Sequence, residues 1–313
     1  MTKYCFGVDI GGTTVKMGLF SAEGELIDKW EIPTRTEHEG EAILPDVAAS
    51  IQKKTEEAKI VVSEIAGVGV GIPGPVDGQG RVQSTANLGW GYKEVKRELQ
   101  ELIGGIRVEA GNDANVAAMG ELWLGAGRGE KNVVMVTLGT GVGGGIVVDG
   151  RMLVGENGAG GEIGHICVNP HEKEACGCGL HGCLEQYASA TGIARLAGRR
   201  LAANADETVL RGGELDAKAV FDAVKEGDAV AMEIAAEFGR YLGEAMAELA
   251  VIVNPAVIII GGGVSKAGSV LLPYIEEPFR RKAFFADRDT RFVLASLGND
   301  AGICGAARLI LEE

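Results

Sequence analysis

The sequence predicts an α/β fold made of two related halves that face each other. Short apolar runs of strand length alternate along the chain with longer stretches of helical periodicity, which is the pattern of α/β proteins. A strand, a glycine turn and a second strand occupy residues 4–25, and the same arrangement recurs at 132–151. The chain of 313 residues is also longer than one compact core usually is, so we expect two domains.

The first half is expected to open with an antiparallel meander. Its three strands are predicted at 4–10, 15–20 and 26–32, and glycine-containing turns connect them. Apolar residues recur near helical spacing over 41–59, which predicts an amphipathic helix, and a Pro- and Gly-rich loop runs through 73–90. The other elements of this half are expected as a strand at 65–72, a helix at 92–102 and a strand at 106–109.

The second half is expected to begin with a capped helix over 114–124. Asn112 or Asp113 is suited to cap its start, and the glycines after Leu124 end it. The strands that follow are predicted at 132–138, 146–151, 256–260 and 291–297, and the helices at 184–201, 217–253 (with an acidic turn near 226–228), 270–282 and 301–311. We therefore expect a small domain of residues 1–110, on which the closing helix 300–313 packs, and a large domain of residues 111–299 that contains a cysteine-rich loop at 165–183.

The charge and hydropathy of the chain argue against several classes of protein. Its net charge of −14 and pI of about 4.9 would repel a nucleic-acid backbone or an anionic membrane, so neither partner is expected. No stretch approaches the roughly 18 apolar residues that a membrane span needs, and the first residues lack the layout of a signal peptide. We therefore expect a cytoplasmic location, where thiols stay reduced and clustered cysteines favour a metal over disulfides.

The cysteine-rich loop is the strongest local signal for a metal. Three of the six cysteines, Cys176, Cys178 and Cys183, fall within eight residues and are separated by glycines. Three thiolates and one histidine would make a tetrahedral zinc site, although a free thiol cluster or a redox pair is the alternative. Spacing alone does not choose the histidine, because His165, His171 and His181 all lie close by in sequence. We expect a structural metal that holds two flanking acids, Glu162 and Glu185, against a substrate, and we expect the other three cysteines, Cys5, Cys167 and Cys304, in the core.

Three glycine turns that follow apolar strands are candidate phosphate sites. They begin at Gly11, Gly139 and Gly261, and glycine lets backbone N–H groups approach a phosphate closely; the alternative is a tight hairpin without a ligand. The first turn is flanked by Asp9, which either holds Mg²⁺ or braces the hairpin, and by residues with phosphate-binding side chains, namely Thr13, Thr14 and Lys16. The sequence contains neither a P-loop nor a convincing dinucleotide-binding βαβ unit.

Five motifs in this order resemble the ROK family of bacterial sugar kinases and sugar-sensing repressors. They are Asp9-Ile10-Gly11-Gly12-Thr13-Thr14-Val15-Lys16, Gly111-Asn112-Asp113-Ala114-Asn115, Leu138-Gly139-Thr140-Gly141-Val142-Gly143-Gly144-Gly145, Gly161-Glu162-Ile163-Gly164-His165 and the Cys-x-Cys-Gly-x-x-Gly-Cys-x-Glu motif that begins at Cys176. The resemblance runs from residue 4 to the closing helix. It implies the actin-like ATPase (ribonuclease H-like) fold, with two α/β domains around a cleft and a zinc-binding loop.

The resemblance also implies roles for individual residues. Asp113 matches the general base that takes a proton from the sugar hydroxyl, and the other matching sugar ligands are Asn112, Glu162, His165 and Glu185. The matching zinc ligands are His165, Cys176, Cys178 and Cys183. The residues expected to hold ATP and Mg²⁺ are Asp9, Gly11, Gly12, Thr13, Thr14, Lys16, Gly139, Thr140 and Gly141, together with Gly261, Gly262, Gly263 and Val264, which match the adenosine contact. Asn87, in the long loop, is either a further sugar contact or an ordinary turn asparagine.

The expected activity is ATP-dependent phosphorylation of a hexose at the 6-hydroxyl, foremost glucose. Phosphoryl transfer needs mainly in-line positioning and charge neutralisation, and one carboxylate near the attacking hydroxyl is enough as a base. An N-acetylmannosamine or N-acetylglucosamine kinase of the same family is the nearest alternative. A non-catalytic sugar-binding protein is disfavoured by the intact Asp113 and both phosphate turns. A sugar-sensing repressor is disfavoured by a first strand that starts at residue 4 and by the acidic net charge. Members of the family are commonly dimers or tetramers, so a homo-oligomer is expected.

Overall fold

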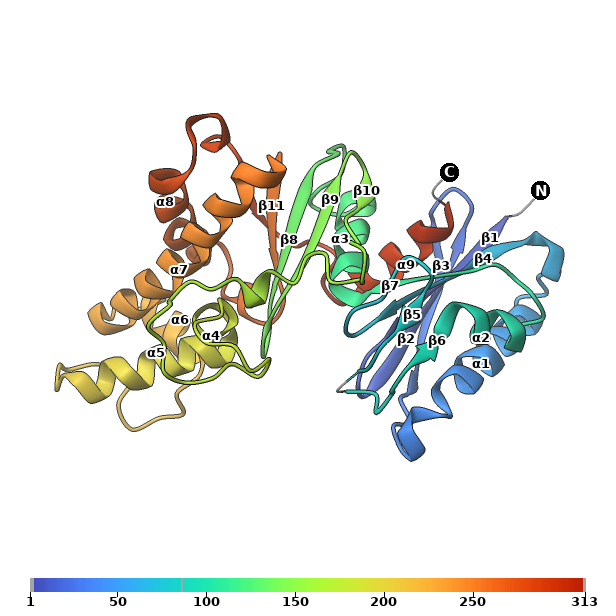
Figure 1. Ribbon diagram of the computed structural model, residues 1–313, viewed down its shortest axis with the longest axis horizontal. Helices are drawn as coiled ribbons and strands as arrows, with labels where there is room; N and C mark the ends of the chain where they lie inside the picture. The colour runs from blue at the N-terminus through green and yellow to red at the C-terminus, as the bar shows by residue number, and fades with distance from the viewer. Residues whose placement is uncertain (1–2, 86, 312–313) are drawn as a thin grey trace.

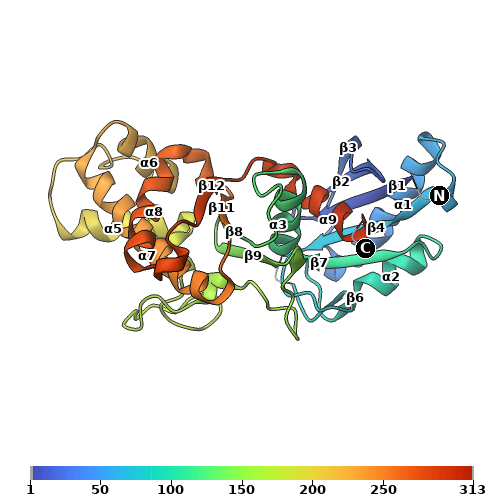
Figure 2. The same ribbon diagram turned by 90° about the horizontal axis from the view of Figure 1, so that it is seen from above.

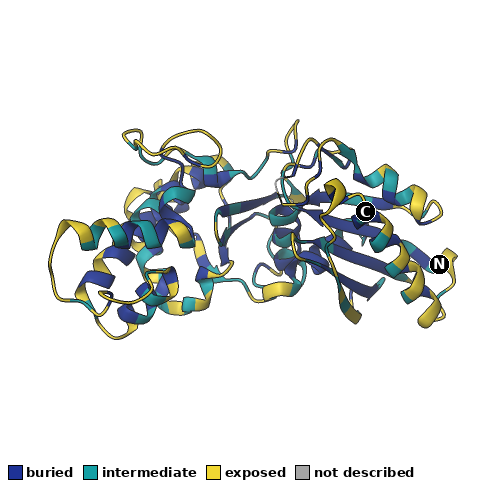
Figure 3. Cartoon of the chain, turned by 90° about the horizontal axis from the view of Figure 1, so that it is seen from below, coloured by how far each residue is buried: buried dark blue, intermediate teal, exposed yellow. Residues whose placement is uncertain are grey.

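The computed structural model describes residues 3–85 and 87–311 and contains two five-stranded mixed sheets. A pair of helices, α3 (Asp113–Leu124) and α9 (Ala301–Leu311), lies between the two sheets (Figures 1 and 2). Figure 3 shows the strands of both sheets largely buried, whereas the exposed residues gather on the outer faces of the helices and on loops. None of the helices in the described ranges is long and apolar enough to cross a membrane.

The first sheet has the strand order β3-β2-β1-β4-β7. Its strands are β1 (Tyr4–Ile10), β2 (Thr14–Ser21), β3 (Leu26–Pro33), β4 (Ile65–Ile72) and β7 (Val108–Asn112). The pairs β1–β2 and β2–β3 are antiparallel, so the predicted meander is confirmed, whereas β4 and β7 run parallel to β1. The carboxyl ends of the parallel strands therefore meet at one edge, where ligands usually bind in sheets of this kind.

Helices cover both faces of the first sheet. On one face α1 (Ile43–Glu57) and α2 (Val95–Leu102) share a core with the inward side chains of β1, among them Phe6 and Val8. On the other face α9 lies directly on the strands. A Cβ atom at Gly7 would overlap the carbonyl oxygen of Ile303, and one at Gly69 would overlap that of Ala306, so glycine at these two positions permits the close contact.

The second sheet repeats this layout in the order β10-β9-β8-β11-β12. Its strands are β8 (Val133–Leu138), β9 (Val142–Val148), β10 (Arg151–Met152), β11 (Val257–Gly261) and β12 (Arg291–Leu294). An antiparallel hairpin, β8–β9, again leads into two strands parallel to the first, which agrees with the internal repeat in the sequence. The short strands β5 (Arg81–Val82) and β6 (Lys93–Glu94) form a separate pair beside the first sheet.

Five helices pack on the second sheet around the largest core of the molecule. They are α4 (Glu185–Ala188), α5 (Ala190–Ala203), α6 (Ala217–Lys225), α7 (Ala229–Val253) and α8 (Leu272–Lys282). The single helix expected over 184–201 is interrupted at Ser189, which has extended backbone angles and accepts a hydrogen bond from Gly192 N at 2.9 Å. The acidic turn predicted near 226–228 is confirmed, because Asp228 caps α7. Single 3-10 turns occur at η1 (His38–Gly40), η2 (Val62–Glu64), η3 (Ile163–His165), η4 (Val264–Ala267), η5 (Ser269–Leu271), η6 (Phe285–Asp287) and η7 (Gly298–Asp300).

The glycines at 143–145 were expected in a turn, but they form the first half of β9. They pair with Thr137, Val136 and Met135 of β8. A Cβ atom at Gly144 would lie 2.5 Å from Gly161 O, and one at Gly145 would lie 2.5 Å from Ala114 O. Glycine is therefore needed here for close packing of a strand rather than for a turn.

Helices α3 and α9 cross so closely that glycine is required at the contact. A Cβ atom at Gly305 would overlap the carbonyl oxygen of Val116, and one at Gly120 would overlap that of Ala301. The buried carboxylate of Glu121 accepts hydrogen bonds from Ser296 N at 2.9 Å and Leu297 N at 2.8 Å, which ends β12 three residues earlier than predicted. From this arrangement we propose a small domain of residues 1–110, on which the closing helix 300–313 packs, and a large domain of residues 111–299.

Candidate active site

A cleft of about 520 Å³ lies between the two sheets and brings many of the predicted residues together. Side chains reach it from the end of β1, the start of α3, the loop before η3 and the start of α4. The predicted site residues that line it are Asp9, Lys16, Asp113, Gly139, Gly141, Glu162, His165, Glu185 and Gly262. The cleft therefore contains four carboxyl groups and one lysine.

Asp113 has the geometry of a general base. It is the first residue of α3, and its Oδ1 accepts hydrogen bonds from Ala114 N at 2.8 Å and Asn112 Nδ2 at 3.1 Å. These two bonds fix the carboxylate and leave Oδ2 to take a proton. Burial raises the pKa of Asp113 to about 6, and the negative charges of Asp9 and Glu162 add to this shift. A carboxyl group with this pKa is largely ionised at neutral pH and still basic enough to accept a proton.

Asn112 lies behind Asp113 and does not line the cleft. Its Oδ1 accepts from Ala114 N at 3.0 Å and Asn115 N at 3.1 Å, so it caps α3. Its Nδ2 donates to Gly74 O at 3.0 Å as well as to Asp113. In this structure Asn112 therefore caps α3 and joins Asp113 to the 73–78 loop, and its role as a sugar ligand stays a prediction.

Asp9 and Lys16 face each other across the β1–β2 hairpin and both line the cleft. Burial raises the pKa of Asp9, and the positive charge of Lys16 opposes that shift. A Cβ atom at Gly302, in the first turn of α9, would lie 2.5 Å from Asp9 Cγ, so glycine there leaves room for the carboxylate. Asp9 is thus positioned where a divalent cation could meet a phosphate.

The first glycine turn is a tight hairpin at the edge of the first sheet. Gly11 N donates to Thr14 O at 3.0 Å, while Gly12 and Thr13 are exposed. Asn87 is exposed. It lies beside this turn, since its Cβ is 3.4 Å from the position that a Cβ on Gly12 would take. These residues, with Thr14, do not line the cleft between the sheets as it stands here.

The second and third glycine turns lie between the cleft and a neighbouring cavity of about 460 Å³. Gly139, Gly141 and Gly262 face the cleft, whereas Thr140, Gly263 and Val264 line the cavity. The cavity is mostly apolar, and its walls include Phe221 of α6 and three lysines, Lys218, Lys225 and Lys266. Gly261 ends β11, is buried and lines neither space.

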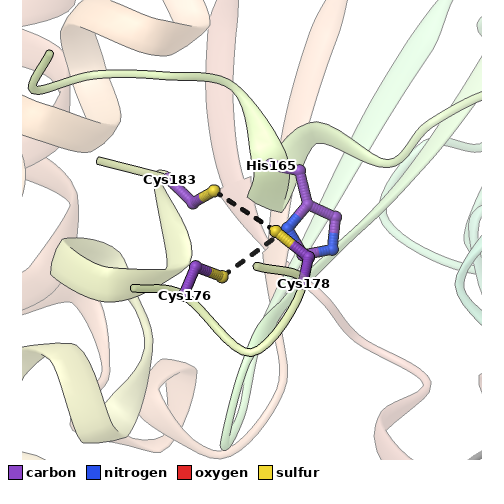
Figure 4. A group of neighbouring side chains, drawn as sticks. All are labelled: His165, Cys176, Cys178 and Cys183. Atoms are coloured by element: carbon purple, nitrogen blue, oxygen red, sulfur yellow. Dashed lines mark hydrogen bonds between the residues drawn. The ribbon is translucent and has the colours of Figure 1, made fainter. Parts of the chain in front are cut away.

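The cysteine-rich loop brings four potential metal ligands together (Figure 4). The ligand atoms of His165, Cys176, Cys178 and Cys183 all lie within 4.8 Å of one another. The Sγ atoms of Cys178 and Cys183 are 3.7 Å apart, and Cys176 Sγ is 3.9 Å from His165 Nδ1. Two sulfur atoms bonded to one tetrahedral Zn²⁺ at about 2.3 Å would lie about 3.8 Å apart, so the donor set fits zinc.

The structure also distinguishes the other histidines and cysteines. His171 and His181 are exposed and lie outside the four-residue group. Cys5 and Cys304 are buried, as predicted, but the prediction for Cys167 is wrong, because its side chain is exposed. The backbone of Cys167 pairs with that of Cys183 in an isolated bridge. Cys167 therefore supports the cysteine-rich loop through its backbone while its side chain remains accessible.

The cysteine-rich loop contacts the cleft through Glu185. Cys176 Sγ donates to Glu185 Oε1 at 2.9 Å, and a Cβ atom on Gly141 would lie 2.7 Å from Glu185 Oε2. Glu185 thus lies between the cysteine cluster and the second glycine turn. His165 belongs to both features as well, since it lines the cleft and has its Nδ1 in the cluster.

Sequence reasoning missed a third wall of the cleft, formed by Gly298, Asn299, Ala301 and Gly302. A signal for it was present, because Gly298-Asn299-Asp300-Ala301 repeats Gly111-Asn112-Asp113-Ala114. Each tetrapeptide immediately precedes or begins one of the two crossing helices, α9 and α3. The repeated tetrapeptide therefore occupies corresponding positions in the two halves, at the start of α3 and at the start of α9.

Comparisons with known proteins agree with this arrangement. The model of the ROK family matches residues 5–313. A curated protein of Halalkalibacterium halodurans, named glucokinase, is 43% identical over 99% of this chain and 96% of its own length. The crystal structure of a ROK family glucokinase from Streptomyces griseus, in complex with glucose and AMPPNP, is 34% identical, with a TM-score of 0.76 over 98% of both chains. The ROK hexokinase from Thermus thermophilus is 33% identical, with a TM-score of 0.82 over 97% of this chain and 96% of that one.

Proposed function

Because the chain belongs to the ROK family, we propose that it is an ATP-dependent hexose kinase that phosphorylates glucose at the 6-hydroxyl. The observation that supports this most strongly is the cleft itself. Asp113 offers a fixed carboxylate with a pKa of about 6, next to three polar side chains that can bind sugar hydroxyls, namely Glu162, His165 and Glu185. The similar proteins named glucokinase favour glucose over an N-acetylhexosamine.

The two neighbouring spaces suggest how the substrates are placed. The hexose would occupy the cleft with its 6-hydroxyl at Asp113 Oδ2, and the nucleoside would occupy the apolar 460 Å³ cavity. Gly139, Gly141 and Gly262 lie where the phosphates would pass from one space to the other, and glycine allows backbone N–H groups to approach them. Attack would then be in line, with Asp113 accepting the hydroxyl proton.

The many acids in the cleft make a cation necessary for ATP binding. Asp9 would hold Mg²⁺, directly or through water, and Lys16 adds a positive charge beside it. Bound Mg²⁺ would neutralise the charge on the transferred phosphoryl group. The turn of Gly11, Gly12, Thr13 and Thr14, whose two central residues are exposed, would reach the phosphates if the two sheets approach each other. Asn87 would then lie beside the sugar.

Zinc is proposed as a structural metal held by His165, Cys176, Cys178 and Cys183. When bound, the zinc ion would cross-link the loop that carries these ligands. Coordination through Nδ1 would fix the ring of His165 and leave its Nε2 to bind a sugar hydroxyl. The metal would then shape the pocket without taking part in proton or phosphoryl transfer. The cytoplasmic location and the homo-oligomeric state, dimer or tetramer, stay predictions from the sequence.

The test is an ADP-release assay with ATP and a panel of glucose, mannose, N-acetylmannosamine and N-acetylglucosamine. We expect the highest kcat/KM with glucose and, by NMR of the product, a phosphate on the 6-oxygen. A higher kcat/KM with an N-acetyl sugar would favour the alternative kinase. No ADP release with any sugar, combined with measurable glucose binding, would favour a sugar-binding or sensing protein. Replacing ATP with polyphosphate, with formation of glucose 6-phosphate as the readout in place of ADP, identifies the donor.

A further inference from the structure

Asn115 is a buried side chain close to the cleft that has no role in the mechanism described above. It lies in the first turn of α3, two residues after Asp113, and is 2% exposed. Its Nδ2 donates to Gly160 O at 3.0 Å, and its Oδ1 accepts from Ile146 N at 3.4 Å. One side chain therefore joins the helix that carries the base to β9 and to the segment that leads into Glu162.

The partner segment is built to lie against Asn115. Gly161 has a φ of +93°, which favours glycine, and a Cβ atom there would lie 3.2 Å from Asn115 Oδ1 and 2.7 Å from Gly144 O. On the strand side, a Cβ atom at Gly144 would lie 2.5 Å from Gly161 O. Because glycine stands at both positions, the segment that leads into Glu162 lies within hydrogen-bond distance of the side-chain amide of Asn115.

We propose that Asn115 is a positioning residue that fixes the sugar ligands Glu162 and His165 relative to the base Asp113. This role rests on the proposed hexose kinase function. The side-chain amide provides both a donor for Gly160 O and an acceptor for Ile146 N, whereas an ionised carboxylate has no donor and alanine has neither group. The link is short, since Gly160 and Glu162 are two residues apart and the 3-10 turn that contains His165 follows at once.

Loss of this link would act on the hexose and on the chemical step together. Displacement of the segment that carries Glu162 would weaken hexose binding and misalign the hydroxyl with Asp113, and a shift of about 1 Å can reduce a rate by roughly 100-fold. The nucleotide turns Gly139–Gly141 and Gly262–Gly263 do not contact Asn115 in the interactions described here. We therefore expect hexose KM to rise and kcat to fall, with KM for ATP changed by less than about twofold.

The test compares Asn115→Asp and Asn115→Ala with a matched control, Asn132→Ala. Asn132 also joins two segments through its amide, since its Oδ1 accepts from Asp149 N at 2.8 Å, but it lies outside the cleft. We expect kcat/KM for glucose to fall about 10- to 100-fold in both Asn115 variants and to stay within about threefold in the control. In Asn115→Ala the acid limb of the pH–rate profile should stay near pH 6, because Asn112 and Ala114 still hold Asp113, whereas the added carboxylate of Asn115→Asp should move it upward. Asn115→Asp, which keeps the size and the acceptor, carries the test if Asn115→Ala does not fold.

Hydrogen exchange separates failure of this inference from failure of the proposed function. We expect faster exchange of the amides of residues 161–165 in the Asn115 variants than in the parent protein and in Asn132→Ala. If the parent phosphorylates no hexose while this exchange difference is present, the function is wrong and the link still holds. Unchanged exchange at 161–165, or wild-type kcat and hexose KM in Asn115→Asp, would overturn the inference.

Discussion

At the scale of single residues, the raised pKa of Asp113 connects activity to stability. Burial is the main cause, and the charges of Asp9 and Glu162 add to it. The same features that make the carboxylate a stronger base also make its ionised form unfavourable in the folded protein. Activity and stability should therefore depend on pH in opposite directions around pH 6.

The first prediction concerns the pH dependence of activity. Because the base must be ionised, kcat/KM for glucose should be constant near pH 7.5 and should fall about tenfold per pH unit below the Asp113 pKa of about 6. Initial rates between pH 5 and pH 8, with the structure checked by circular dichroism at each pH, would measure this limb. A rate independent of pH over that range would contradict the assignment of Asp113 as base.

The second prediction concerns Asp113→Asn. A pKa raised above that of the unfolded chain means that the folded protein binds this proton more tightly, so the ionised carboxylate destabilises the fold above pH 6 and this effect disappears as pH falls toward 4. Asparagine removes the charge, so we expect the variant to be about 1 to 3 kcal/mol more stable at pH 7.5, with less advantage at pH 5.5. We also expect kcat to fall about 10²- to 10⁴-fold while glucose binding is kept.

Urea unfolding at the two pH values and glucose binding by calorimetry check these outcomes. Glu162→Gln serves as a comparison, since it also removes one cleft carboxylate but leaves the base in place. Substantial turnover by Asp113→Asn would refute its role. Equal stability of Asp113→Asn and the parent at pH 7.5 would refute the electrostatic account.

At the scale of elements, α3 is the part of the fold on which the site depends. It begins with Asp113, carries Asn115 in its first turn, and contacts α9 through glycine. Farther along, Glu121 binds the backbone that leads into α9, and that connection forms the third wall of the cleft. The position of α3 against α9 therefore affects the distance between Asp113 and Asp9, which lies beside Gly302 of α9.

The third prediction tests this crossing with Gly305→Ala. A methyl group at residue 305 would overlap the backbone oxygen of Val116, so the helices must separate, although alanine favours a helix by about 1 kcal/mol. We expect a net loss of about 2 to 4 kcal/mol and a lower kcat, measured by urea unfolding and the ADP-release assay. The matched control is Gly198→Ala in α5, where the nearest atom to the new methyl is Leu215 Cδ2 at 3.9 Å. Stability and kcat equal to those of this control would contradict the prediction.

The elements also show how far the sequence can be interpreted. Apolar periodicity and turn residues predicted most of the strands and helices, because those signals are local. The glycines at 143–145 were predicted in a turn, but they lie in a strand. Glycine is needed there for close contact with Gly161 and Ala114, which are distant along the chain or on another element. Asp113 and the cysteine cluster were predictable from residue type and motif. The hydrogen bond of Asn112 to Gly74 depends on tertiary packing, and the wall at 298–302 has only the repeated Gly-Asn-Asp-Ala tetrapeptide as a signal in the sequence.

At the scale of the whole molecule, the cleft is formed only where the two halves meet. Asp9 and Lys16 come from the first sheet, Gly139 and Gly262 from turns that follow strands of the second, and α3 joins the two sheets. The first glycine turn, residues 11–14, and Asn87 lie outside the cleft in this arrangement. Substrate binding should therefore depend on how the two halves are held relative to each other. On the wall of the cleft that the cysteine-rich loop contacts, it should depend on how that loop is held.

The last prediction is that zinc holds that wall. Because His165 and Glu185 contact both the cysteine cluster and the cleft, removal of the metal should displace two sugar ligands and leave the nucleotide cavity intact. Dialysis against a chelator should raise KM for glucose at least tenfold, with KM for ATP within about twofold, and Zn²⁺ rather than added Mg²⁺ should restore it. Cys178→Ser should reproduce this effect, whereas Cys167→Ser, which alters an exposed thiol outside the cluster, should not. Elemental analysis that finds no zinc in folded, active protein, or a wild-type KM for glucose in Cys178→Ser, would show that the loop holds the wall without a metal.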